Sequence, residues 1–250
     1  MQLDAAIVHL RKRTPWQALD TGILLARRWY GRLLTIWLAV GSVLLPLIVA
    51  AAWLLPGATL NWALFLFWLL HPMMESALVF WAGRAMFAAE QTVVQSLRLW
   101  RGLFSFSFQA GVIRYRLHPL RPFAYAVLVL DEPEARLAAP RIDLLGRRQD
   151  NTAFFLLAGL AITVLFSFSA LVAAFTLIPE EIHQLSLADL ISPVGRWLLF
   201  ALYTAVCALM APFTVSCGFM LYISRRVELE AWDIELGFRN LNARLMAEKR

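Results

Sequence analysis

The sequence has little charge for its length. Of its 250 residues, 16% are charged and 60% are hydrophobic, and the mean hydropathy is +0.65. A soluble domain usually has about 25% charged and about 45–50% apolar residues. The excess apolar residues are gathered in long runs, which excludes an ordinary soluble domain and predicts an integral membrane protein.

The sequence also lacks the usual signs of catalysis and of metal binding. Its two cysteines, Cys207 and Cys217, lie in one apolar run, where a helix would separate them by about 15 Å, too far for a disulfide. It contains no zinc-protease, Walker, nucleophile-elbow, dinucleotide-binding or Cys-x-x-Cys motif. We therefore expect no enzymatic activity, no metal site and no cofactor.

Four apolar runs reach the length of about 20 residues that a helix needs to cross a bilayer. They are residues 33–55, 60–83, 152–178 and 196–224. The pattern predicts an all-α integral membrane protein with four transmembrane helices in a single membrane domain.

The basic residues predict the orientation of these helices. All but one of the 23 lysines and arginines lie in residues 1–32, 84–151 and 225–250, and the exception, Arg196, ends the connection 179–195. Basic residues accumulate on the cytoplasmic side, so we expect the inner membrane of a bacterium, cytoplasmic termini and a periplasmic 179–195 loop. Attraction to anionic headgroups then explains the net charge of +6 better than nucleic-acid binding does.

The cytoplasmic segments contain amphipathic patterns. Thr14-Pro15-Trp16-Gln17 is a helix start signal, and 14–31 follows as a helix that lies either in the headgroup plane or beneath the bundle. Residues 84–101 are similar. In the rest of the middle loop, Phe104–Phe108 alternates and Phe123–Leu130 is strand-like. A small β-hairpin, two extended segments and a short buried helix all fit this pattern.

The C-terminal segment 225–250 has two apolar stripes on nearly opposite sides of a predicted cytoplasmic helix. One apolar face is typical of an interfacial helix, so two faces suggest burial on both sides. The second face would meet this chain's own segments, the bilayer surface or a partner. The candidate docking residues are Arg225, Arg226, Glu230, Trp232, Asp233, Glu235 and Phe238.

His71 and Glu75 are the ionisable residues inside the predicted spans. They are four positions apart and so share one helix face, close to the middle of the 60–83 run. Pro72 lies between them, and we expect helix kinks at Pro46, Pro72 and Pro212. The pair has three interpretations: a structural polar pair, a transport or proton site, or a contact with a partner.

Motifs at both ends of the chain resemble an uncharacterised family of proteobacterial inner-membrane proteins. They are Arg13-Thr14-Pro15-Trp16 near the start, Arg121-Pro122-Phe123 in the middle loop, and Arg225-Arg226 with Leu229-Glu230-Ala231-Trp232-Asp233 near the end. His71-Pro72-Met73-Met74-Glu75-Ser76 stands where the family has Lys-Pro-Leu-Tyr-Asp-Arg, so proline and an acid are kept and the final arginine is lost. The resemblance implies genes beside those for MoxR-type ATPases, von Willebrand factor A-like proteins and transglutaminase-like membrane proteins.

Two functions follow as hypotheses. The first is a non-catalytic subunit or scaffold of a bacterial envelope-associated assembly, with membrane-protein or MoxR-type ATPase partners and no nucleic acid. The alternative is a small transporter or lipid-handling protein that uses Glu75 and His71.

Overall fold

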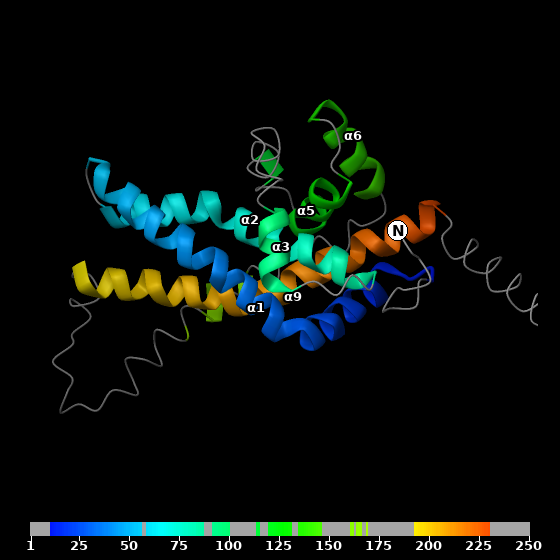
Figure 1. The fold of residues 1–250 in the computed structure, drawn as a ribbon, viewed down its shortest axis with the longest axis horizontal. Helices are drawn as coiled ribbons and strands as arrows, with labels where there is room; N and C mark the ends of the chain where they lie inside the picture. The colour runs from blue at the N-terminus through cyan, green and yellow to red at the C-terminus, as the bar shows by residue number, and fades with distance from the viewer. Residues whose placement is uncertain are drawn as a thin grey trace, which may run out of the picture.

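The computed structural model describes residues 11–56, 59–87, 92–100, 114–115, 120–131, 135–146, 161–162, 164–166, 169 and 193–230. This part of the chain is helical and contains no strand. The named helices are α1 (Pro15–Leu54), α2 (Thr59–Met86), α3 (Val93–Trp100), α5 (Arg121–Leu130), α6 (Ala135–Gly146) and α9 (Pro193–Glu230). Figure 1 shows α1, α2 and α9 as the three long elements, with α5 and α6 beside the orange end of α9.

Three of these helices are long and apolar enough to cross a membrane, namely α1, α2 and most of α9. They identify the chain as a membrane protein. The predicted span 152–178 lies largely outside the described residues. The few of its residues that are described are helical, and their large apolar side chains, among them Leu165 and Phe166, are exposed.

The start signal in the sequence is confirmed at the beginning of α1. The Thr14 hydroxyl accepts a hydrogen bond from the Gln17 amide at 3.3 Å, and the Gln17 side chain accepts one from the Thr14 amide. These bonds satisfy two amides that a helix leaves without partners. From there α1 continues for 40 residues, so the predicted amphipathic segment 14–31 and the predicted span 33–55 form one helix.

The long helices lie side by side, and side-chain contacts show which residues of neighbouring helices lie at the same height along the bundle. The Tyr30 hydroxyl donates to the Leu209 carbonyl at 3.2 Å, and the Ser224 hydroxyl donates to the Arg13 carbonyl at 3.4 Å, so α1 and α9 run antiparallel. The rings of Trp29 in α1 and Trp81 in α2 meet edge to face at 5.3 Å. Trp37 lies 6.4 Å from His71, measured between ring centroids.

The strand alternative for residues 123–130 is wrong, because these residues belong to helix α5. Pro122 lies in the first turn of α5, where a missing amide hydrogen is harmless. Every residue from Pro122 to Val129 is buried. A helix that is buried on all sides has no polar face, so its sequence shows no helical period to distinguish it from a strand. The Phe104–Phe108 segment lies outside the described residues.

Burial divides the three long helices into two halves. In the open half, consisting of 38–54 of α1, 59–70 of α2 and 196–210 of α9, large apolar side chains are exposed, including Trp53 (70%) and Leu198 (56%). In the packed half, consisting of 15–31 of α1, 71–86 of α2, 211–230 of α9, α5 and α6, long stretches are wholly buried. These stretches include 71–83 and 215–224. In Figure 1 the packed half lies toward the right and the open half toward the left.

Candidate functional site

The predicted polar pair of α2 lies at the beginning of the packed half. His71 and Glu75 are both buried, and the His71 Nδ1 atom lies 3.9 Å from Glu75 Oε1. They share one face of α2, as their spacing predicts. Trp37 of α1 and Phe67 of α2 border the imidazole, with ring centroids at 6.4 Å and 5.3 Å. The carboxylate is therefore enclosed by protein.

Arg121 supplies the countercharge to Glu75 from a distant part of the sequence. Its Nη2 atom donates to Glu75 Oε1 at 3.2 Å, across a separation of 46 residues. The carboxylate raises the pKa of Arg121 above its usual value, although burial acts in the opposite direction. The charge of the acid is thus compensated inside the protein.

Two glycines allow α5 to approach closely enough for this contact. A Cβ atom on Gly218 of α9 would lie 2.4 Å from the Cβ of Pro122 and 2.5 Å from its carbonyl carbon. A Cβ on Gly83 of α2 would lie 2.4 Å from a methyl group of Leu130. The first contact involves backbone, so a larger residue at 218 would push α5 away from α9. Glycine therefore fixes the place from which Arg121 reaches Glu75.

The second oxygen of Glu75 and the indole nitrogen of Trp37 remain unsatisfied. Both atoms are buried, and neither has a hydrogen-bond partner in the described part of the chain. A buried polar atom without a partner costs about 1–3 kcal/mol. Glu75 Oε2 can accept a hydrogen bond or a proton, and the Trp37 N–H can donate a hydrogen bond to an acceptor.

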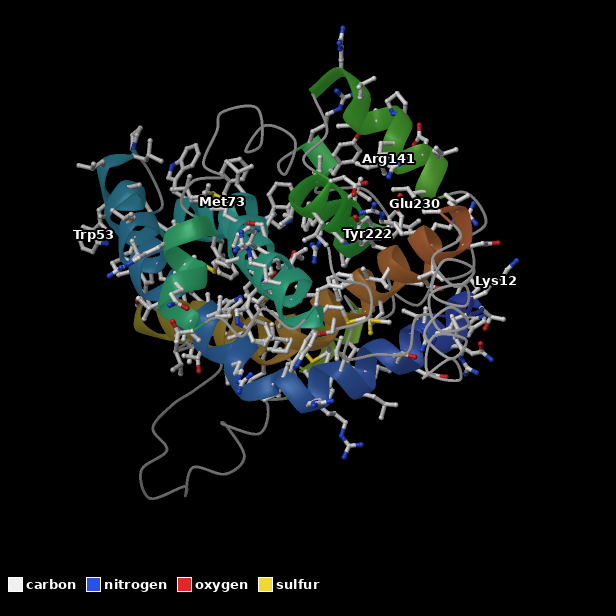
Figure 2. The ribbon with its side chains drawn as sticks, turned by 45° about the vertical axis from the view of Figure 1, so that its right-hand side comes forward. Lys12, Trp53, Met73, Arg141, Tyr222 and Glu230 are labelled. Atoms are coloured by element: carbon white, nitrogen blue, oxygen red, sulfur yellow. The ribbon has the colours of Figure 1, made fainter. Side chains whose placement is uncertain are left out.

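A second polar cluster lies deeper in the packed half and centres on Asp131, which directly follows α5. Its Oδ1 atom accepts from the Tyr222 hydroxyl at 2.5 Å and from Arg226 Nη1 at 3.0 Å. Its Oδ2 atom accepts from Arg141 Nε of α6 at 2.9 Å. Glu230 accepts from both arginines, with the shortest distance 2.7 Å to Arg226. Figure 2 shows Arg141, Glu230 and Tyr222 gathered where α6 meets the end of α9.

The described members of the predicted docking set are engaged within the chain. Arg226 and Glu230 belong to the Asp131 cluster, and Arg225 donates to the Leu145 carbonyl at 3.2 Å and pairs with Glu228. Lys12 also approaches Glu228, at 3.4 Å. The other four members, Trp232, Asp233, Glu235 and Phe238, lie outside the described residues. Pro46, Pro72 and Pro212 lie inside α1, α2 and α9, and the kinks expected at them stay a prediction.

Sequence reasoning missed three members of these clusters, namely Arg121 as the partner of Glu75, and Asp131 and Arg141 as partners of α9. Arg121-Pro122-Phe123 carried a signal, because a basic residue before a proline-started apolar helix can reach a buried acid. Among the described residues, no group of three histidine, cysteine or acidic side chains could hold a metal ion.

Comparisons with protein-family models, with curated proteins and with solved structures give no match for this chain. The long apolar helices define the class of the chain, which is a helical membrane protein. Its candidate site is the buried ion pair between α2 and α5.

Proposed function

We propose that the chain is a non-catalytic, multi-pass subunit or scaffold of an envelope-associated assembly in a bacterial inner membrane. The observation that carries the proposal is the packed half, in which ion pairs join α5, α6 and α9 into one body with exposed leucines on its surface. A rigid body with exposed apolar side chains can bind a partner at small entropic cost. The concentration of basic residues at this end favours a cytoplasmic position for it.

Helix α6 supplies the surface that suits this role. Its buried face, made by Ala138, Ile142 and Leu145, packs into the bundle. Leu137 and Leu144, seven positions apart and so on one face, are 52% and 46% exposed. Arg141 between them holds α6 in place through Asp131 and Glu230. The partner surface therefore centres on α6 instead of on the arginines at the end of α9. The family resemblance favours a MoxR-type ATPase as the partner.

The test is affinity purification from native membranes in mild detergent, with mass spectrometry of the proteins that follow. We expect stoichiometric partners with the wild-type chain and their loss with Leu137→Gln/Leu144→Gln. Leu24→Gln is the matched control, because Leu24 is 64% exposed on α1, away from α6. Trp232→Gln/Phe238→Gln examines the C-terminal segment in the same way. A stable wild-type particle without partners would contradict the proposal.

A small transporter or lipid-handling protein is the second candidate, and the unsatisfied atoms beside His71 favour it. A proton bound there would neutralise Glu75, and a small polar molecule with a donor and an acceptor would pair with Glu75 Oε2 and with the Trp37 N–H. In proteoliposomes, Glu75→Gln should then abolish flux while size-exclusion chromatography shows that the purified protein stays folded, although loss of the Arg121 pair lowers its stability. Flux that is unchanged in Glu75→Gln would eliminate this candidate and leave the ion pair with a purely structural role.

A further inference from the structure

The exposed side of α1 changes its chemistry along the helix. Its charged side chains, namely Asp20, Arg27, Arg28 and Arg32, all lie before residue 33, where Trp16 and Leu24 are exposed as well. Residues 33–54 carry no charge, and several of their large apolar side chains are exposed. The apolar set is Leu38, Val43, Leu47, Trp53 and Leu54. Lipid-facing positions are apolar, and arginines at the ends of spans reach the headgroups. The change therefore places the hydrocarbon boundary between Arg32 and Leu38.

The arginines at this boundary form a compact group. Arg28 and Arg32 are four positions apart and so are neighbours on one face of the helix. Arg27 directly precedes Arg28 and lies on the adjoining face. Gly31 lies between them, and a Cβ atom there would meet nothing within 4 Å. The helix surface at Gly31 is thus not covered by any neighbouring part of the described chain.

These three arginines differ from four other arginines at the same end of the molecule. Within the described chain, Arg27, Arg28 and Arg32 form no ion pair or hydrogen bond, whereas Arg121, Arg141, Arg225 and Arg226 all pair with acids. Like charges on neighbouring turns of a helix repel one another. Their grouping without an acid leaves the three guanidinium groups available to an anion from outside the chain.

The helix holds this group facing outward. Trp29 and Tyr30, which lie between the arginines in the sequence, contact Trp81 of α2 and the Leu209 carbonyl of α9. Trp29 is buried, while the arginines are exposed. The guanidinium groups are therefore presented away from the bundle, at the level where lipid headgroups begin.

We propose that Arg27, Arg28 and Arg32 bind the phosphate of an anionic phospholipid in the leaflet at the arginine-rich end. The planar guanidinium matches phosphate oxygens in a bidentate manner, and the exposed apolar side chains of Leu38 and Val43 contact the acyl chains of the same lipid layer. The site depends on neither the partner nor the transport proposal, since it uses residues outside both.

Native mass spectrometry of the purified full-length chain tests this site. The protein is mixed with equal amounts of phosphatidylglycerol and phosphatidylcholine, and the ratio of retained lipids is measured. We expect the wild type to retain phosphatidylglycerol preferentially. Arg28→Gln/Arg32→Gln should lower that preference about fivefold for each arginine removed, the effect of one basic residue near an anionic surface.

Two variants separate a defined site from diffuse attraction. Arg11→Gln/Arg98→Gln removes the same charge from two other exposed positions and should keep the preference. Arg28→Lys/Arg32→Lys keeps the charge but removes the planar groups, and should give an intermediate ratio. Equal retention of both lipids by the wild type, or an equal loss in the Arg11/Arg98 variant, would overturn the proposal. So would displacement of the lipid by inorganic phosphate, or an unchanged ratio in the lysine variant.

Discussion

The open and packed halves have similarly apolar sequences and different surroundings. In α9, the residues 196–210 expose leucines such as Leu198 and Leu209, whereas 215–224 are buried throughout. Hydropathy measures only that a side chain avoids water, and it is equally high whether lipid or protein surrounds the helix. The apolar run 196–224 therefore contains two environments. Its second part is surrounded by the other helices of the packed half, at the arginine-rich end of the molecule.

The largest expected effect comes from the buried ion pair between Arg121 and Glu75. Arg121→Met should lower the free energy of unfolding by about 3–5 kcal/mol, because it leaves Glu75 charged and buried without its partner. Unfolding is measured by SDS titration in mixed micelles. Arg121→Met/Glu75→Leu should recover most of the loss, since the double variant leaves no unpaired charge. Lys12→Met is the control, because its side chain is 68% exposed and its pair with Glu228 contributes about 0–1 kcal/mol. Equal stability of the single and double variants would refute a buried charge pair.

Replacing one leucine by alanine in each half compares how much the same side chain stabilises the two halves. Leu221→Ala in the packed half removes a side chain with 0% exposure and should cost about 2–5 kcal/mol through lost contacts and a cavity. Leu47→Ala in the open half should cost well under that, because the 58% exposed side chain leaves space that lipid or detergent fills. The same titration measures both. Similar losses would mean that 47 is also enclosed by protein.

The sequence predicted the three long helices of the described chain, because the length of an apolar run reports directly on the thickness of the bilayer. It predicted the α1 start and the His71–Glu75 face for similarly local reasons. It could not distinguish a helix from a strand at 123–130, where burial on all sides removes the period. It also could not join Arg121 to Glu75, because that contact depends on the close approach of Pro122 to Gly218. Long-range packing, and not local pattern, created the candidate site.

Alanine substitutions at two glycines compare a position in close contact with backbone to an open position. Gly218→Ala places a Cβ 2.4 Å from Pro122 and should destabilise the protein by about 1–3 kcal/mol, since backbone must move. Gly31→Ala is the matched control, because nothing lies within 4 Å of the new atom. It should stabilise α1 by about 0.5–1 kcal/mol through helix propensity. Thermal unfolding followed by tryptophan fluorescence measures both changes. A neutral Gly218→Ala would mean that α5 is free to shift away from α9.

The smallest expected effect concerns the place where the packed half begins. Thr14→Ala removes the side-chain oxygen that accepts from the Gln17 amide and should cost about 1 kcal/mol. The effect should appear in global unfolding, because the first turns of α1 pack against α9 through Ser224 and the Arg13 carbonyl. Thr92→Ala removes the same kind of cap from the eight-residue helix α3. Hydrogen exchange should show its effect as local opening of α3 without a change in global stability. If Thr14→Ala also acts only locally, the first turns of α1 do not contribute to the cooperative packed half.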